Sequence, residues 1–308
     1  MTTNAIQSSH IYSTYFAPRG RSRIYTLGMQ IAQLYLSRFD PIIGFIGEAG
    51  SGKSVLIKGM FPGIELTNDD DGVNVRPLPL LEQEYETGFF TPHTYHLDIR
   101  FETGFHQLSE LADAVRLAVR RGKRIIIEHF DLIYPLLGVN ANLLIGVGEQ
   151  IVITRPNLFG PLPQELYDIV YPSLAYRLMA HSAEDLCEYA MTQEQMLACS
   201  HGDIRHGFVL EFSEHQPDID IPTLEARVNE LIRQDLPIDY YDESHILLGG
   251  AQHYCTGPRT HVRSTGRIIG FRLLDHFIYD HFHKTYMLVG CVGDDSEENI
   301  RKLETIHG

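Results

Sequence analysis

One eight-residue segment constrains the fold of this 308-residue chain more than any other part of it. Residues 47–54 read GEAGSGKS and match the pattern G-x-x-x-x-G-K-[ST] at every position. The apolar run PIIGFIG before it predicts a buried strand, and VLIKGMF after it has the apolar spacing of a helix. A strand, a glycine-rich turn and a helix in this order are the structural context in which this motif binds a nucleotide.

The residue types in this turn suit a nucleotide phosphate. Glycines let consecutive backbone N–H groups surround phosphate oxygens, while Lys53 places a cation near the β- and γ-phosphates and the Ser54 hydroxyl ligates Mg²⁺. The following helix directs its positive dipole end at the same anion. The alternative is a chance match in a glycine-containing turn. We predict an ATP and Mg²⁺ site with these binding residues: Gly47, Gly50, Ser51, Gly52, Lys53, Ser54 and Val55.

A nucleotide site of this kind needs a further acidic group near the metal and the attacking oxygen. Glu128 ends the β-branched run RIIIE, and Asp98 follows a short strand in TYHLDIRF. The alternatives are a solvated strand-end residue for Glu128 and a helix cap or turn carboxylate for Asp98. Asp70, within the acidic run 69–71, could act as a general base on a substrate hydroxyl or belong to a turn before Gly72. We predict Lys53, Asp98, Glu128 and Asp70 as the catalytic residues.

The rest of the chain divides into two patterns. Up to about residue 157, strands alternate with helices, as in a parallel sheet: helices at 24–39 and 108–121, strands at 124–130 and within 143–157. The segment 157–172 is rich in Pro and Gly and suggests a boundary. An α+β pattern follows, with helices at 173–191 and 223–234 and strands at 207–213, 237–241, 267–274 and 285–292. We predict an N-terminal arm and helix (1–39), a nucleotide-binding α/β domain (40–160) and an α+β domain (170–308).

Charge and composition limit the partners. Lys and Arg number 25 against 40 Asp and Glu, a net charge of −15, which argues against non-specific adhesion to nucleic acid or anionic membranes. No apolar run approaches the roughly 20 residues of a spanning helix, and the first ten residues have no signal-peptide pattern. Four cysteines in a chain this long do not make a disulfide scaffold. These features predict a cytoplasmic protein with no membrane partner.

The second half contains a candidate metal site. Cys255 and His261 are six positions apart on an expected loop before the strand 267–274, and His181 and Asp185 share one face of the expected helix. Together the four residues would supply the ligands of a Zn²⁺ ion, with His201 and His206 in reserve. The alternative is that these residues are core or capping residues.

The first half resembles a known family. In order, the segments GEAGSGKS, LLEQEY, YHLDIRFE and IIIEHFD resemble those of the small P-loop ATPase of bacterial tRNA threonylcarbamoyladenosine biosynthesis, over roughly residues 40–137. The resemblance implies that Lys53 and Ser54 hold phosphate and magnesium, that Asp98 lies in a switch-like segment and that Glu128 is the catalytic acid. The chain differs from the family at 76–78, where Arg-Pro-Leu replaces Ser-Pro-Thr, and at His129, which replaces a tryptophan.

The second half resembles another family. Four segments over roughly residues 175–275 are similar to the second additional, editing-type domain of alanyl- and threonyl-tRNA synthetases: HSAEDL, FVLEFSEH, LEARVNELI and CTGPRTHVRSTGRI. The resemblance implies His181, Cys255 and His261 as zinc ligands, with Asp185 where the family has a second helix histidine. Two additional residues, Pro258 and Arg259, lengthen the Cys-to-His interval.

Three functional hypotheses follow. In the first, the chain hydrolyses ATP or transfers its γ-phosphoryl group to a small-molecule acceptor, and the editing-like domain recognises a substrate or partner. The second is a zinc-dependent trans-editing aminoacyl-tRNA hydrolase with a regulatory nucleotide site, and the third is a non-catalytic nucleotide-dependent switch in tRNA modification. A tRNA-related substrate would need a local basic patch, for which the candidates are Arg259, Arg263, Arg267 and Arg272, unless these form a solvated strand face. The basic, aromatic segment 12–23 could reach over a phosphate or a neighbouring subunit of a homo-oligomer, or be a plain surface arm.

Overall fold

The computed structural model describes residues 12–67, 80, 93–213 and 215–307 of a mixed α/β protein. The chain forms two compact units. Unit 1 comprises Met1–Ala17 and Arg21–Pro172, and unit 2 comprises Pro18–Gly20 and Ser173–Gly308. The division falls within one long helix, α8 (Pro163–Ala190), next to its internal Pro172.

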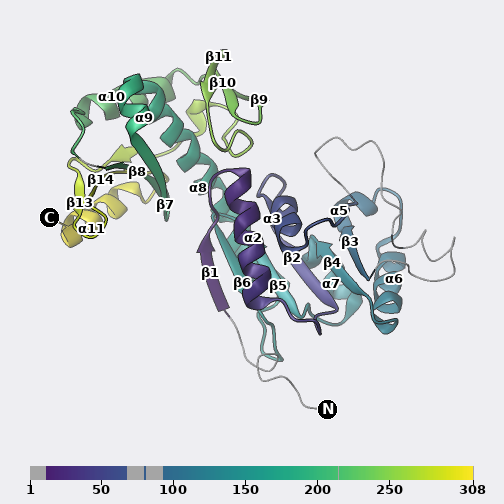
Figure 1. Cartoon of the computed structure of the whole chain (residues 1–308). Helices are drawn as coiled ribbons and strands as arrows, with labels where there is room; N and C mark the ends of the chain where they lie inside the picture. The colour runs from purple at the N-terminus through teal and green to yellow at the C-terminus, as the bar shows by residue number, and fades with distance from the viewer. Residues whose placement is uncertain (1–11, 68–79, 81–92, 214, 308) are drawn as a thin grey trace. The chain divides into compact units, whose positions relative to one another are not determined.

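Unit 1 is built on a six-stranded, mostly parallel sheet (Figure 1). Its strand order is β1-β6-β5-β2-β4-β3, where β5, β2, β4 and β3 are parallel. At one edge β6 pairs antiparallel with β5, and β1 pairs antiparallel with β6. The strands in this order are Tyr12–Phe16, Gln150–Thr154, Leu143–Val147, Ile42–Ile46, Arg124–Glu128 and Thr94–Asp98. In this parallel part the carboxyl ends of the strands lie at one edge, where such sheets bind ligands.

The central strands are apolar at almost every position because helices cover both faces of the sheet. Ile43, Phe45 and Ile126 pack against α2 (Arg21–Tyr35) and α3 (Lys53–Met60). Ile42, Ile46 and the alternate residues of β4 pack on the other face, against α6 (Leu108–Arg120) and α7 (Phe130–Leu137). The short helix α5 (Ile99–Glu102) follows β3 directly.

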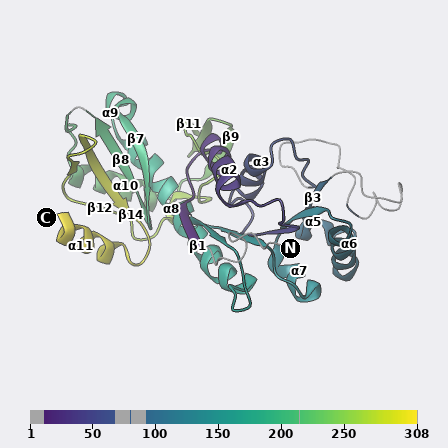
Figure 2. The same ribbon diagram turned by 60° about the horizontal axis from the view of Figure 1, so that its bottom comes forward.

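Two glycines let α2 and α3 approach closely. A Cβ atom on Gly28 would lie 2.5 Å from the Leu56 carbonyl oxygen, and one on Gly59 would lie 2.2 Å from that of Tyr25. Figures 1 and 2 show the two helices side by side. Because α3 begins at Lys53, this contact fixes the helix that follows the glycine-rich turn.

Unit 2 is α+β. Its larger sheet has the antiparallel order β12-β14-β8-β7, with β13 also paired to β14. These strands are Arg272–Leu273, Thr285–Cys291, Gly207–Ser213, Cys199–Ile204 and Ile278–Asp280. One face packs against α8 and α10 (Ile221–Arg233), and the other against α11 (Ser296–His307). The helix α9 (Gln193–Ala198), a 3₁₀ turn (Thr265–Arg267) and a three-stranded sheet complete the unit: β9 (Ile238–Asp242), β10 (His245–Leu248) and β11 (Ala251–Tyr254).

Several elements differ from the sequence predictions. The helix expected at 173–191 already begins at Pro163, because proline is well tolerated in the first turn of a helix. The strand expected at 267–274 is reduced to Arg272–Leu273, because Gly270 has a φ of +64° and interrupts the extended run. Strand β7 was not predicted, since CSHGDI is not apolar.

The segment expected to be an arm is part of the fold. Tyr12–Phe16 forms β1 and pairs with β6 along its whole length, α2 begins at Arg21, and Arg19 between them is buried. The aromatic residues that suggested an arm are those of a strand. Among the described residues, no helix has the length and apolar character needed to cross a lipid bilayer.

We expect Gly59→Ala to destabilise the protein by about 1–3 kcal/mol, because the added methyl group would overlap the Tyr25 carbonyl and force α2 and α3 apart. Denaturant unfolding of the full chain measures the change. Gln30→Ala, on the exposed face of α2, is the matched control and should leave the unfolding midpoint nearly unchanged. Equal stability of the Gly59→Ala protein and the wild type would contradict the close packing.

Candidate functional site

The glycine-rich turn joins the carboxyl end of β2 to the N-terminus of α3. Gly52 directly precedes the helix and has a φ of +91°. Residues other than glycine rarely adopt this backbone conformation. The Lys53 ammonium is buried and donates to the carbonyl oxygens of Gly47 and Glu48, both at 3.0 Å. The turn therefore holds a desolvated positive charge beside the start of a helix.

Glu128 lies next to this turn because β4 is the parallel neighbour of β2. The register pairs Phe45 with Glu128, so both strands end at the same level. The Ser54 hydroxyl donates to Glu128 Oε1 at 3.3 Å, and Lys53 Nζ lies 3.6 Å from Glu128 Oε2. One buried carboxylate thus contacts both side chains that the sequence assigned to phosphate and magnesium.

His96 holds this carboxylate from the next strand. The backbone N–H of Thr67 donates to His96 Nδ1 at 3.1 Å, so the ring proton lies on Nε2 and is donated to Glu128 Oε1, also at 3.1 Å. Burial alone would raise the pKa of Glu128, but the hydrogen bond from His96 and the charge of Lys53 lower it to about 2. Glu128 is therefore ionised at neutral pH.

Asp98 is a helix cap, which was the alternative interpretation of this residue, and it also lies at the candidate site. Its Oδ1 accepts a hydrogen bond from Phe101 N at 3.1 Å and caps α5. Asp98 also ends β3 in register with Glu128. One ligand atom each from Asp98, Glu128 and His129 lie within 4.8 Å of one another, close enough to share a metal ion.

The sequence did not assign a role to two further residues at this edge, His129 and Arg100. His129 follows Glu128 in a left-handed conformation (φ 56°, ψ 46°), which is strained for a residue other than glycine and is common at functional sites. Burial and the positive charges of Lys53 and Arg100 lower its pKa to about 4. Arg100 donates to Glu48 at 2.6 Å and to the Tyr171 hydroxyl at 3.0 Å. The only available signal was the position of His129 and Arg100 next to predicted acids.

Asp70, the fourth predicted catalytic residue, lies outside the described residues, as do residues 76–78. The predicted binding residues Gly47, Gly50, Ser51, Gly52 and Val55 all lie in the turn or the first turn of α3. Their part in nucleotide binding stays a prediction.

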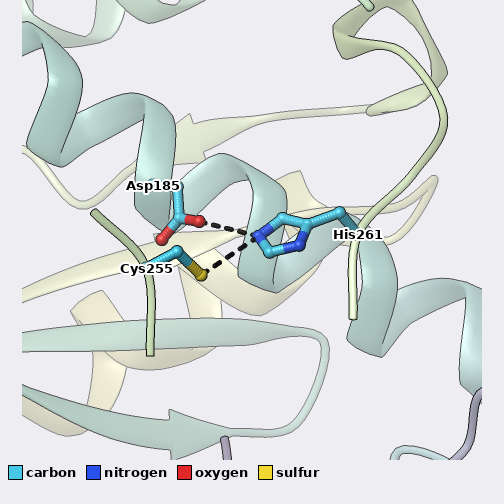
Figure 3. Close-up of side chains that lie close together, drawn as sticks. All are labelled: Asp185, Cys255 and His261. Carbon is cyan, nitrogen blue, oxygen red and sulfur yellow. Dashed lines mark hydrogen bonds and ion pairs between the residues drawn. The ribbon is translucent and has the colours of Figure 1, made fainter. Parts of the chain in front are cut away.

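Unit 2 brings three of the four predicted zinc ligands together (Figure 3). Asp185 comes from α8, and Cys255 and His261 from the chain after β11. His261 Nε2 lies 2.7 Å from Asp185 Oδ2 and 3.7 Å from Cys255 Sγ. Carboxylate, thiolate and neutral imidazole are all zinc ligands, so the chemistry of this set fits the metal.

A buried arginine occupies the same place. Arg19 is 1% exposed, and its guanidinium forms ion pairs with Glu184 and Asp185. The same group lies 3.7 Å from Cys255 Sγ. Burial lowers the pKa of Arg19, but the surrounding acidic groups, Glu184 first, raise it further, so the guanidinium stays charged. A permanent cation therefore already neutralises part of the predicted ligand set.

The remaining histidine candidates lie apart from this set. His181 Nε2 faces Asp203 at 3.8 Å, and burial lowers its pKa to about 3. His206 stacks on Tyr176 and pairs with Asp295 at 2.9 Å. His201 pairs with Glu188. The prediction that His181 joins Asp185, Cys255 and His261 does not agree with this geometry, because its ring is directed to β7.

Two of the four predicted basic-patch arginines pair with carboxylates. Arg259 lies 3.5 Å from Glu243 and stacks over Tyr240, and Arg272 lies 3.4 Å from Glu225. These pairs reduce the local positive charge available to a polyanion.

Comparison with known proteins adds no family to this description. Neither a scan against protein-family models nor a search of curated proteins finds a match to the chain. Both resemblances stay predictions, and the argument about function rests on the geometry of the two units.

The lowered pKa of His129 predicts how the free energy of unfolding depends on pH. Because folding lowers this pKa from 6.5 to about 4, the unfolded chain binds more protons, and His129 contributes stability that is present above pH 6.5 and lost as the pH falls toward 4. Asn adopts the left-handed conformation readily and does not titrate. The unfolding free energy of the wild type minus that of His129→Asn should therefore decrease as the pH falls from 7 to 4.

Denaturant unfolding at several pH values measures this difference. His283→Asn is the control, because the hydrogen bond with Asp280 raises the pKa of exposed His283. Its contribution has the opposite sign: it is present below pH 6.5 and lost as the pH rises. A His129→Asn difference that does not change with pH would contradict the assignment.

Proposed function

We propose that the chain is an ATP-binding P-loop enzyme that hydrolyses ATP or transfers its γ-phosphoryl group to a small-molecule acceptor. The observation that carries this proposal is the contact of Glu128 with both Ser54 and Lys53 at the carboxyl ends of β2 and β4. A lysine, a hydroxyl and a strand-end carboxylate converging on a glycine-rich turn are the parts that phosphoryl transfer uses.

Each residue has a chemical role in this proposal. The backbone N–H groups of the turn and of the first turn of α3 bind phosphate oxygens, and Lys53 exchanges its two carbonyl partners for the β- and γ-phosphates. Ser54 and Glu128 would hold Mg²⁺, directly or through water, and this ion would offset the negative charge of the phosphates. The burial of Lys53 and Glu128 strengthens these interactions because little water screens them.

Glu128 and His129 suit activation of an attacking hydroxyl group, which belongs either to water or to a substrate alcohol. Glu128 is ionised and held in one orientation by His96, so it can orient the hydroxyl for attack. His129 beside it is a neutral imidazole at physiological pH and can accept the proton. Arg100 at the mouth of the turn is charged and within reach of an added phosphate when it releases Glu48.

The resemblance of unit 2 to an editing-type domain supports a role for it in recognising a tRNA-related substrate or partner. The trans-editing hypothesis needs an open zinc ion at Asp185, Cys255 and His261, and the guanidinium of Arg19 at these atoms weighs against it. The ATP-dependent reaction is therefore the function we favour.

Lys53→Ala should weaken ATP binding by roughly 10- to 100-fold, the loss expected when one charge-assisted hydrogen bond to phosphate is removed. Equilibrium binding of a labelled ATP analogue with Mg²⁺ measures the affinity. Lys58→Ala, one turn later on the same helix, is the matched control and should bind as the wild type does. Equal affinity of the wild type and Lys53→Ala would refute the nucleotide site.

Glu128→Gln should leave ATP binding largely intact but reduce turnover by roughly 10²- to 10⁴-fold, because the amide keeps the shape of the side chain and removes its charge. Single-turnover assays with γ-labelled ATP, with and without a pool of small metabolites, measure the rate and show whether label ends on phosphate or on an acceptor. Unchanged turnover would exclude Glu128 from the chemistry.

A further inference from the structure

A second group of metal-ligand side chains lies in unit 2 and has no role in the proposed ATP reaction. It is centred on Glu188, which lies three residues after Asp185 on α8. Cys199 and His201 are two positions apart on β7 and therefore share one face of that strand. Ligand atoms of Glu188, Cys199 and His201 lie within 4.8 Å of one another. We call these three residues the Glu188 cluster; His253 forms a neighbouring group with Glu188 and Asp185.

The two oxygens of Glu188 face nitrogen and sulfur donors on both sides. His201 Nε2 is hydrogen-bonded to Oε1, and Cys199 Sγ lies 3.8 Å from the same oxygen. His253 Nε2, from β11, lies 4.0 Å from Oε2. In the described part of the chain, neither a lysine nor an arginine forms an ion pair with Glu188, in contrast to Asp185.

His253 gives independent evidence for a ligand. Its side chain is 8% exposed, and its Nε2 has no hydrogen-bond partner among the described residues. Tyr189, the neighbour of Glu188, packs edge-on against the ring, with the ring centroids 5.8 Å apart. A buried imidazole nitrogen without a partner is unfavourable unless water or a metal ion completes its bonding.

The buried carboxylates on α8 also favour a cation in addition to Arg19. Of the three carboxylates Glu184, Asp185 and Glu188 on α8, Arg19 forms ion pairs with the first two, and Glu188 pairs with His201. Buried carboxylates are stable when they are paired or coordinate a metal. Glutamate, cysteine and histidine side chains form a ligand set that suits zinc.

We propose that unit 2 binds a zinc ion at Glu188, Cys199 and His201, with the His253 imidazole beside the second Glu188 oxygen, and that the guanidinium of Arg19 takes the place of a metal at Asp185, Cys255 and His261. Two positions for a cation then lie next to each other along α8: a zinc ion at Glu188 and the Arg19 guanidinium at Asp185. The zinc ion joins the C-terminal part of α8 to β7.

Zinc content of the full-length protein, purified and then equilibrated with excess zinc and dialysed, tests the proposal. We expect one ion per chain in the wild type. In Glu188→Gln and His201→Gln the affinity should fall by at least the roughly 100-fold that loss of an outer-shell partner costs. Cys255→Ser and the exposed control His276→Gln should keep the ion. No nucleotide is present, so the result does not depend on the ATP proposal.

Arg19→Met tests the second part of the proposal. Removal of the guanidinium leaves Asp185, Cys255 and His261 without their cation, so this variant should take up a second zinc ion. Zinc content that stays at one ion would overturn the role of Arg19. Loss of zinc in Cys255→Ser with retention in Glu188→Gln, or a wild type without zinc, would overturn the Glu188 cluster.

Cobalt substitution covers the case in which a charge-changing variant does not fold. A cysteine thiolate bound to Co²⁺ gives a charge-transfer band in the near ultraviolet. This band should disappear in the conservative variant Cys199→Ser and remain in Cys255→Ser. The opposite pattern would assign the metal to the Asp185 group instead.

Discussion

Burial of the parallel strands β2 and β4 between two helical layers is the constraint on which the first candidate site depends. The register that pairs Phe45 with Glu128 follows from packing Ile43, Phe45 and Ile126 on one face and Ile125 and Ile127 on the other. A slip of one residue would move every side chain of the strand to the opposite face of the sheet and disrupt its packing against the helices. Packing of the core therefore holds the Glu128 carboxylate beside Lys53 and Ser54.

This arrangement places opposite charges in a dry environment and keeps them paired. Lys53 and Glu128 are both buried, and each has partners besides the other: backbone carbonyls for the ammonium, and His96 and Ser54 for the carboxylate. Paired in this way, buried charges are tolerated, and they remain available to a ligand that offers better partners. The close contact of α2 with α3 through Gly28 and Gly59 keeps the start of α3 fixed while such an exchange takes place.

Unit 2 also buries charged side chains, but there the carboxylates outnumber the basic groups. Its carboxylates outnumber the guanidinium groups beside them, and histidine and cysteine side chains fill the remaining positions. A fixed arginine and a metal ion are two solutions to one requirement, since either supplies positive charge to a carboxylate removed from water. Arg19 comes from a segment far from α8 in the sequence, so its position depends on the tertiary fold.

Local sequence patterns specify several elements of the fold. Apolar runs gave β2, β4, β8 and β14, amphipathic spacing gave α6 and α10, and the motif at 47–54 placed a glycine-rich turn between a strand and a helix. The sequence also singled out Lys53, Ser54, Asp98 and Glu128 before their proximity was known. Tertiary packing brings together residues that are separated in the sequence: His96 with Glu128, Arg19 with Asp185, and Glu188 with the polar strand β7. Strand order, register and the partner of a buried charge depend on packing between distant segments, and no local pattern encodes them.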